Sequence, residues 1–230
     1  MTVLSRIAQT GPAKGLRTRM ADGIIRRLAL TALIDRTDNF DRVTWLGRPI
    51  WQNVTDAWLI QEAIVHDDVD FVVECGTNRG GSAFYMASIF DLMGRGRVLT
   101  IDVETLADFE HPRIEFLIGS STDQAIVNTV RDRIERAHPK HVLVVLDSDH
   151  SQSHVEREMR LYAEFLKVGE YMHVQDGCAD ELAIFAHARP GPLRAIERFV
   201  AHDSRFVVDE ERSRRYLVSH SPKGWLRRVR

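Results

Sequence analysis

The sequence predicts one α/β domain in which a mostly parallel sheet is covered by helices on both faces. Segments 69–75, 98–102, 114–118 and 142–147 are short, nearly continuous apolar runs, which is typical of strands buried on both sides. These runs alternate with longer segments of helical periodicity, as consecutive βαβ units require. The 230 residues are enough for one sizeable core and too few for two comfortable ones.

The first part of the chain is expected to form a small N-terminal helical cap, 1–45, ahead of a main domain at 46–230. Within the cap, a helix over 22–35 would place four apolar residues toward one side: Ile24, Ile25, Leu28 and Leu33. The main domain begins with a helix over 54–66, for which Asn53 is a suitable N-cap. Its expected inner face consists of Val54, Ala57, Trp58, Gln61 and Ile64.

The later elements follow the same alternation. Helices are predicted over 80–92, 122–138, 151–166 and 193–202. A strand over 171–176 extends the sheet and is followed by a loop at 177–190. Two short runs, 206–208 and 216–219, are expected to close the sheet as an antiparallel pair.

Composition restricts the class of protein. A hydrophobic share of 44% and a charged share of 28% are ordinary for a soluble globular chain. No apolar run reaches the roughly 18 residues that a membrane-spanning helix needs. The two cysteines, Cys75 and Cys178, cannot build a multi-bridge framework, and no segment resembles a secretory signal. A cytoplasmic location is therefore expected.

Charge is distributed unevenly along the chain, although the net charge is only −2. Residues 1–36 contain seven Arg or Lys against two Asp, and residues 212–230 contain seven against no acid. Solvated termini are the simpler interpretation, and weak contact with an anionic surface stays open. Aromatic residues do not interleave with the basic ones, so no nucleic-acid partner is expected.

The turn after the first long strand is rich in glycine and is preceded by an acid. It runs from Glu74 through Gly76, Gly80 and Gly81 to Ser82. Such a turn lets backbone approach a ligand closely, but its glycine spacing is not that of a dinucleotide-binding turn. A carboxylate here would repel a pyrophosphate and would suit the ammonium group of S-adenosylmethionine. The next strand ends in Asp102, which is placed to accept two ribose hydroxyls.

Acidic residues also end two later strands. Asp147 and Asp176 follow neighbouring apolar runs, so they can converge on one hard cation such as Mg²⁺. His150 lies three residues after Asp147 and could accept a proton from a substrate hydroxyl near neutral pH. The competing interpretation is that Asp149 and His150 only cap the helix that follows.

The other histidines and the cysteines carry weaker signals. His173 lies within a strand and is expected to be a packed residue. His154, one turn into a helix, is expected to support the site without contacting substrate. Cys75 is expected to be a small buried residue, and Cys178 has no base beside it in sequence.

Three segments together resemble the cephalosporin hydroxylase family, whose members are S-adenosylmethionine-dependent methyltransferases or look like them. They are Val73–Ser82, Gly119–Asp123 and Leu146–Ser151, and the resemblance covers about 45–225. Residues Trp51, Asp56 and Trp58 and the Gly191-Pro192 pair also look like the family's. The family includes bacterial rhamnosyl and mannoside O-methyltransferases.

The resemblance implies a Rossmann-like class I methyltransferase fold with a seven-stranded sheet, and it assigns roles to single residues. The methionine end of the cofactor would be held by Glu74, Gly76, Thr77, Gly80, Gly81 and Ser82. Asp102 would bind the ribose, Ser120 and Ser121 the adenine side, and Asp147 both cofactor and metal. Family members tend to have Glu-Asp where this chain has Gln175-Asp176, so the metal ligands Asp147, Gln175 and Asp176 lack one charge.

These inferences predict an enzyme that moves a methyl group from S-adenosylmethionine to a hydroxyl of a sugar or glycosylated natural product, with His150 and Asp147 as catalytic residues. A non-catalytic or regulatory S-adenosylmethionine-binding module is the alternative, motivated by Gln175. A dehydrogenase is disfavoured by the glycine spacing. The partner expected is a small-molecule or glycoside acceptor, and self-association into a homo-oligomer stays open.

Overall fold

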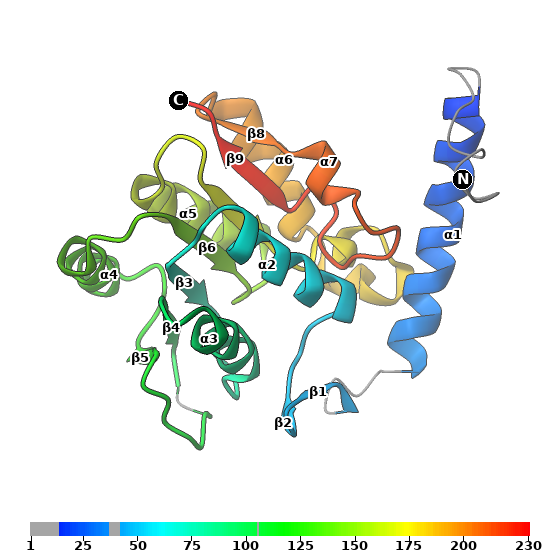
Figure 1. Cartoon of the computed structure of the whole chain (residues 1–230). Helices are drawn as coiled ribbons and strands as arrows, with labels where there is room; N and C mark the ends of the chain where they lie inside the picture. The colour runs from blue at the N-terminus through cyan, green and yellow to red at the C-terminus, as the bar shows by residue number, and fades with distance from the viewer. Residues whose placement is uncertain (1–13, 37–41, 105) are drawn as a thin grey trace, which may run out of the picture.

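The computed structural model describes residues 14–36, 42–104 and 106–230. A seven-stranded sheet forms its centre, in the order β5-β4-β3-β6-β7-β9-β8 (Figure 1). Five strands are parallel: β3 (Phe71–Cys75), β4 (Arg97–Asp102), β5 (Ile114–Ile118), β6 (Val142–Leu146) and β7 (Tyr171–Val174). The antiparallel strand β9 (Trp225–Arg228) pairs with β7, and β8 (Phe206–Val208) pairs with β9. The predicted Rossmann-like α/β fold with a mostly parallel seven-stranded sheet is confirmed.

Helices cover both faces of the sheet. On one face lie α2 (Val54–His66) and α3 (Gly81–Met93), which pack through residues such as Ile64 and Phe90. On the other lie α4 (Gln124–Ala137), α5 (Gln152–Tyr162) and α6 (Pro192–His202), with Val130 and Met159 in the core (Figure 1). Smaller elements complete the chain: β1 (Thr44–Trp45), β2 (Arg48–Pro49), α7 (Glu210–Ser213) and the 3-10 helices η3 (Ala163–Phe165), η4 (Gly177–Asp180) and η5 (Ala183–Ala188).

The complete burial of the two central strands explains why these strands could be predicted from apolar segments of the sequence. Every residue of β3 and β6 is buried, because a strand covered on both faces must be apolar at successive positions. In β3, Val73 packs toward α4 and α5, whereas Val72 packs toward α2 and α3. Each predicted strand up to 176 and each predicted helix from 54 onward is present, with ends shifted by a few residues.

The last strand was predicted at the wrong place. Residues 216–219 are not a strand, and β9 lies at Trp225–Arg228 instead. The segment before it is held as a loop, because the Asp56 carboxylate accepts hydrogen bonds from the Ser219 hydroxyl at 2.6 Å and the His220 backbone N–H at 2.7 Å. The Trp225 ring stacks on the buried His173 ring at 4.1 Å and so fixes β9 beside β7.

The N-terminal helix differs from the prediction in length and orientation. Helix α1 spans Lys14–Arg36, and the rest of the predicted 1–45 cap lies partly outside the described residues. Its expected inner residues, Ile24, Ile25, Leu28 and Leu33, are exposed. Leu30 is instead the buried residue, and it packs against Cys178 and Leu182 beside the main domain.

The inner face of α2 was also predicted only in part. Ala57 and Ile64 are buried as expected, but Val54 and Trp58 are exposed. Leu59, Ile60 and Ala63 complete the buried face. Asn53 is the N-cap as predicted, and its side chain accepts from the Thr55 and Asp56 backbone N–H groups.

Candidate active site

The carboxyl ends of the parallel strands place the predicted site residues along one edge of the sheet. Cys75 is paired in register with Ile101 on one side and Leu146 on the other. The residues that follow β3 and β6, Gly76 and Asp147, therefore leave the sheet at the same level, beside Asp102 at the end of β4. Ligands bind at this edge in open α/β sheets.

The glycine turn is tightly enclosed by backbone. Gly76 has φ +101°, and a Cβ on it would lie 2.0 Å from the Asp147 carbonyl oxygen. A Cβ on Gly81 would lie 1.9 Å from the Pro49 carbonyl oxygen. Gly80, in the left-handed conformation, is the N-cap of α3. These glycines therefore let the turn pack directly against the backbone at Asp147 and at Pro49.

Glu74 lies beneath this turn and is 1% exposed. Its carboxylate accepts from the Thr100 hydroxyl at 2.6 Å, and Thr100 in turn contacts the Thr77 hydroxyl at 2.7 Å. Burial raises the pKa of Glu74 to about 7, against the lowering effect of hydrogen bonds from Ser82 and Thr100. An uncompensated buried acid at this position would be stabilised by a cationic ligand.

Asp102 ends β4 with its carboxylate at the mouth of the turn. One oxygen accepts from the Asn78 backbone N–H and the other from the Val103 N–H, each at 2.7 Å. The side chain is only partly buried, so each oxygen retains a lone pair for a further donor.

Asp147, His150 and Asp176 converge at the neighbouring strand ends. One ligand atom from each lies within 4.8 Å of the others. The His150 Nε2 atom lies 3.2 Å from an Asp176 carboxylate oxygen, and the Gln52 amide donates to Asp147 at 2.9 Å. Removal from water, followed by the negative charge of Asp176, raises the pKa of Asp147 well above its ordinary value.

Gln175 is 5% exposed, and its amide nitrogen has no hydrogen-bond partner within the described part of the chain. Its proposed place among the metal ligands stays a prediction.

Asp176 adopts a left-handed backbone with φ 55°, which turns the chain sharply after β7.

A cavity of about 180 Å³ joins the two groups of residues. Its walls include Thr77 and Ser82 from the glycine turn and Asp147, His150 and Asp176 from the acidic cluster. The N-terminal segment closes it with Pro49, Trp51 and Gln52. The structure therefore brings the two predicted groups of residues together at one cavity, and their roles stay a prediction.

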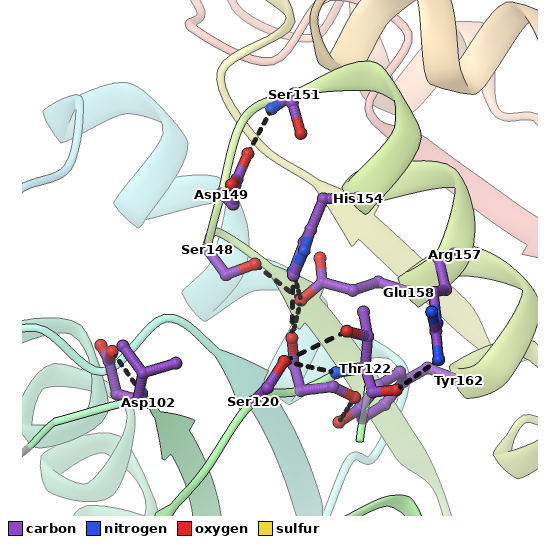
Figure 2. A network of polar contacts seen from close by, with 12 residues as sticks. Asp102, Ser120, Thr122, Ser148, Asp149, Ser151, His154, Arg157, Glu158 and Tyr162 are labelled. Carbon is purple, nitrogen blue, oxygen red and sulfur yellow. Dashed lines mark hydrogen bonds and ion pairs between the residues drawn. The ribbon is translucent and has the colours of Figure 1, made fainter. Parts of the chain in front are cut away.

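A buried acid beside this cavity was missed from the sequence. Glu158 of α5 is fully buried, and one of its oxygens accepts from the Ser121 hydroxyl at 2.5 Å and the Ser148 hydroxyl at 2.6 Å (Figure 2). His154 Nε2 lies 3.3 Å from the same oxygen, and its expected supporting role stays a prediction. The Ser121 hydroxyl is thereby directed to Glu158, while Ser120 contacts the Thr122 hydroxyl at 3.1 Å. Glu158 thus ties the loop after β5 to the loop after β6.

His220 was missed as well, and Asp56 was noted only for its family resemblance, without a role. His220 Nδ1 lies 3.7 Å from one Asp176 carboxylate oxygen, and His150 contacts the other. Burial raises the pKa of Asp56 to about 6, and its hydrogen bonds fix the segment that carries His220. Cys75 is buried as expected, and Cys178 lies near Asp176 and His220, also buried.

Comparison with known proteins identifies the family. The model of the family described as "Rhamnosyl O-methyltransferase/CmcI" matches residues 38–229. The chain belongs to this family. A rhamnosyl O-methyltransferase of Mycobacterium bovis is 33% identical over 191 residues, which cover 80% of this chain and 78% of that protein. The rhamnosyl O-methyltransferase of Mycobacterium leprae is 30% identical over 196 residues, covering 81% and 83%. The O-methyltransferase class expected from the sequence is confirmed.

Solved structures of the family share the fold. An apo-structure of CmcI superposes with a TM-score of 0.65 at 18% identity, covering 84% of this chain and 78% of that one. A CmcI structure with Mg and SAM gives 0.64 at 18% identity with the same coverage. Within the part of the chain that the structure describes, no helix is long and apolar enough to span a membrane.

Proposed function

We propose that this chain transfers a methyl group from S-adenosylmethionine to a hydroxyl of a sugar or glycosylated small molecule. The observation that carries the proposal is the single cavity shared by the glycine turn and by the cluster of Asp147, His150 and Asp176. Membership of a family whose curated relatives are named rhamnosyl O-methyltransferases supports the sugar as acceptor.

The residues at the turn fit the cofactor. Glu74 and the backbone of Gly76–Ser82 would hold the methionine end, because a buried carboxylate and free N–H groups at the start of α3 suit an amino-acid zwitterion. Asp102 would accept the ribose hydroxyls, and Ser120 would flank the adenine. Since the Ser121 hydroxyl donates its proton to Glu158, it could only accept a hydrogen bond from the adenine.

The acidic cluster fits a hard divalent cation. Burial, followed by the negative charge of Asp176, raises the pKa of Asp147, and a bound cation would favour its ionised form. The side-chain carbonyl oxygen of Gln175 would be a third ligand. Bound Mg²⁺ would supply a positive charge that favours ionisation of an acceptor hydroxyl.

His150 would accept the proton of that hydroxyl. Its contact with Asp176, 3.2 Å from Nε2 to a carboxylate oxygen, would orient the ring as the acceptor oxygen attacks the methyl carbon. The carbon–sulfur bond breaks in the same step, leaving S-adenosylhomocysteine. Because the sulfonium is already activated, holding the hydroxyl in line with the methyl group supplies much of the rate.

The N-terminal cap would cover the acceptor together with residues 177–190. Arg26 of α1 pairs with Glu181 at 2.5 Å, and Leu30 packs on Leu182, so α1 is joined to this segment. A division into a cap, 1–45, and a methyltransferase domain, 46–230, remains part of the proposal, as does a cytoplasmic location.

One experiment separates this function from the alternative, a regulatory cofactor-binding module. Purified protein is incubated with radiolabelled S-adenosylmethionine and a panel of rhamnosides and mannosides, and labelled product is counted. Transfer by the wild type that is lost in Asp147→Ala supports the enzyme. Cofactor binding in calorimetry with no transfer to any hydroxylated acceptor favours the module.

A further inference from the structure

A second hollow begins at His150 and runs away from the cofactor side. This groove, of about 900 Å³, is walled by α5 and the three residues before it, by the segment 187–190 and by one residue of α6. His150 also lines the 180 Å³ cavity, so the two hollows meet at the proposed base. An acceptor whose hydroxyl reaches His150 would therefore extend along this groove.

The groove carries excess positive charge. Arg160 of α5 and Arg198 of α6 converge on one carboxylate, Glu156, each at 3.5 Å. Both guanidinium groups are well exposed, with side-chain exposures of 59% and 61%. Glu156 also accepts from the Gln152 amide at 2.7 Å. One carboxylate thus faces two guanidinium groups, and one positive charge stays uncompensated.

Two more arginines line the groove and contact backbone carbonyls. Arg157 donates to the Thr122 carbonyl at 3.1 Å, and no acid of the described chain pairs with it (Figure 2). Arg189 donates to the Ala179 and Leu182 carbonyls at 3.2 and 2.6 Å. The other acid of the groove, Asp149, is engaged by the Ser151 backbone N–H at 2.7 Å. These contacts hold the guanidinium groups in place without neutralising them.

The distance along α5 from its first residue to Arg160 limits how far from His150 an anion would lie. Arg160 is eight residues beyond Gln152 on one helix, or roughly 12 Å along its axis. A sugar ring at His150 with a phosphate or carboxylate on its far side is shorter than this rise, and the long Arg160 side chain, which on a helix leans toward the N-terminus, shortens the distance from its guanidinium to such an anion. Arginine is suited to such groups because its planar fork binds both oxygens at once.

We infer that the acceptor is an anionic sugar, whose phosphate ester or carboxylate lies against Arg160 and Arg198 while its hydroxyl reaches His150. This inference rests on the proposed function. It narrows the acceptor from any glycoside to those with a negative group about one sugar length from the methylated hydroxyl.

Binding is tested first with an anion alone. Inorganic pyrophosphate is titrated calorimetrically into the wild type, into the double variant Arg160→Gln/Arg198→Gln, and into Arg194→Gln. Arg194 is on α6 as well but pairs with Glu197 outside the groove, so it is the matched control. The expected result is binding by the wild type and the control that weakens roughly 10- to 100-fold in the double variant. Equal binding by all three proteins overturns the inference.

Methyl transfer then identifies the anion. A hexose 1-phosphate, a hexuronic acid and a neutral methyl glycoside are compared as acceptors. The double variant is expected to raise KM for the phosphate or carboxylate acceptor roughly 10- to 100-fold, with kcat and the KM for the neutral glycoside unchanged. A neutral glycoside preferred by the wild type overturns the inference. Because calorimetry needs no turnover, it decides on the groove even if no sugar is methylated, a result that would count against the proposed function alone.

Discussion

The carbonyl oxygen of Asp147 lies 2.0 Å from the point that a Cβ on Gly76 would occupy. Two strand ends are therefore in backbone contact at the centre of the site: the turn that would hold the cofactor and the residue that would hold the metal. Any side chain at position 76 must push apart the ends of β3 and β6, which carry the proposed cofactor and metal residues.

Gly76→Ala is expected to lower the free energy of unfolding by more than about 3 kcal/mol and to abolish cofactor binding, because backbone strain and a backbone clash add together. Gly169→Ala is the matched control: its φ of +97° is similar, but no atom lies within 4 Å of the new Cβ. The control substitution should lower the free energy of unfolding by about 1–2 kcal/mol, because it adds the backbone strain without the clash. Urea midpoints measure both, and equal losses would show that the clash is relieved by small shifts.

Glu74 makes the stability of the cofactor-free protein depend on pH. Burial raises its pKa from 4.5 to about 7, so the folded state binds a proton more tightly than the unfolded state does. Its contribution is fully present below pH 4.5 and is lost as the pH rises through 7, which amounts to about 3 kcal/mol.

Glu74→Gln should remove this part of the dependence, leaving a variant more stable than the wild type at pH 8 and no more stable at pH 4.5. Urea unfolding at both pH values measures the difference. The same variant should bind S-adenosylmethionine more weakly, since the carboxylate is gone. Parallel stability curves for the two proteins would contradict the assigned pKa.

The sheet and its reactive edge were predictable because their signals are local. Each buried run, in β3 and in β6, is continuous in sequence, and the acids lie at the end of β4 or within two residues after β6 and β7. Gln52, by contrast, meets Asp147 across 95 residues, and Glu158 meets Ser121 across 37. No spacing rule links such pairs, because each contact exists only after the helices have packed. Strand β9 was predicted at the wrong place for a similar reason, because its position depends on Trp225 stacking on His173.

Asp102 has two tasks that variants can separate. Asp102→Ala should weaken binding of S-adenosylmethionine by roughly 1–3 kcal/mol, the scale of charged hydrogen bonds. It should also destabilise the fold by about 1 kcal/mol, because the Asn78 and Val103 N–H groups lose their acceptor. Asp102→Asn keeps one acceptor oxygen, so it should recover stability more than affinity. Calorimetry and thermal unfolding provide the two readouts, and unchanged affinity in both variants would place the ribose elsewhere.

The predicted metal site is tested through Gln175. If Asp147, Gln175 and Asp176 bind Mg²⁺, Gln175→Glu should tighten binding roughly tenfold by adding a third carboxylate, and Gln175→Leu should weaken it. Affinity should fall as the pH is lowered, since the raised pKa of Asp147 means that protons compete with the cation. Mg²⁺ titration calorimetry with S-adenosylhomocysteine present measures each constant. Identical affinities in the three proteins, or full activity in a chelator, would remove the metal from the proposal.

His150 is expected to be the general base, and its replacement distinguishes the role of the base from the role of the metal. His150→Ala should lower kcat by about 10²–10⁴ while cofactor affinity stays unchanged, because the ring contacts Asp176 and not the glycine turn. His154→Ala is the control: its ring bonds to Glu158 beside the site, so it should change affinity or stability and lower kcat far less than His150→Ala does. A near-wild-type kcat for His150→Ala would leave the acidic cluster as a metal site without a base, whereas a lowered kcat with intact Mg²⁺ binding would show that the two functions reside in different side chains.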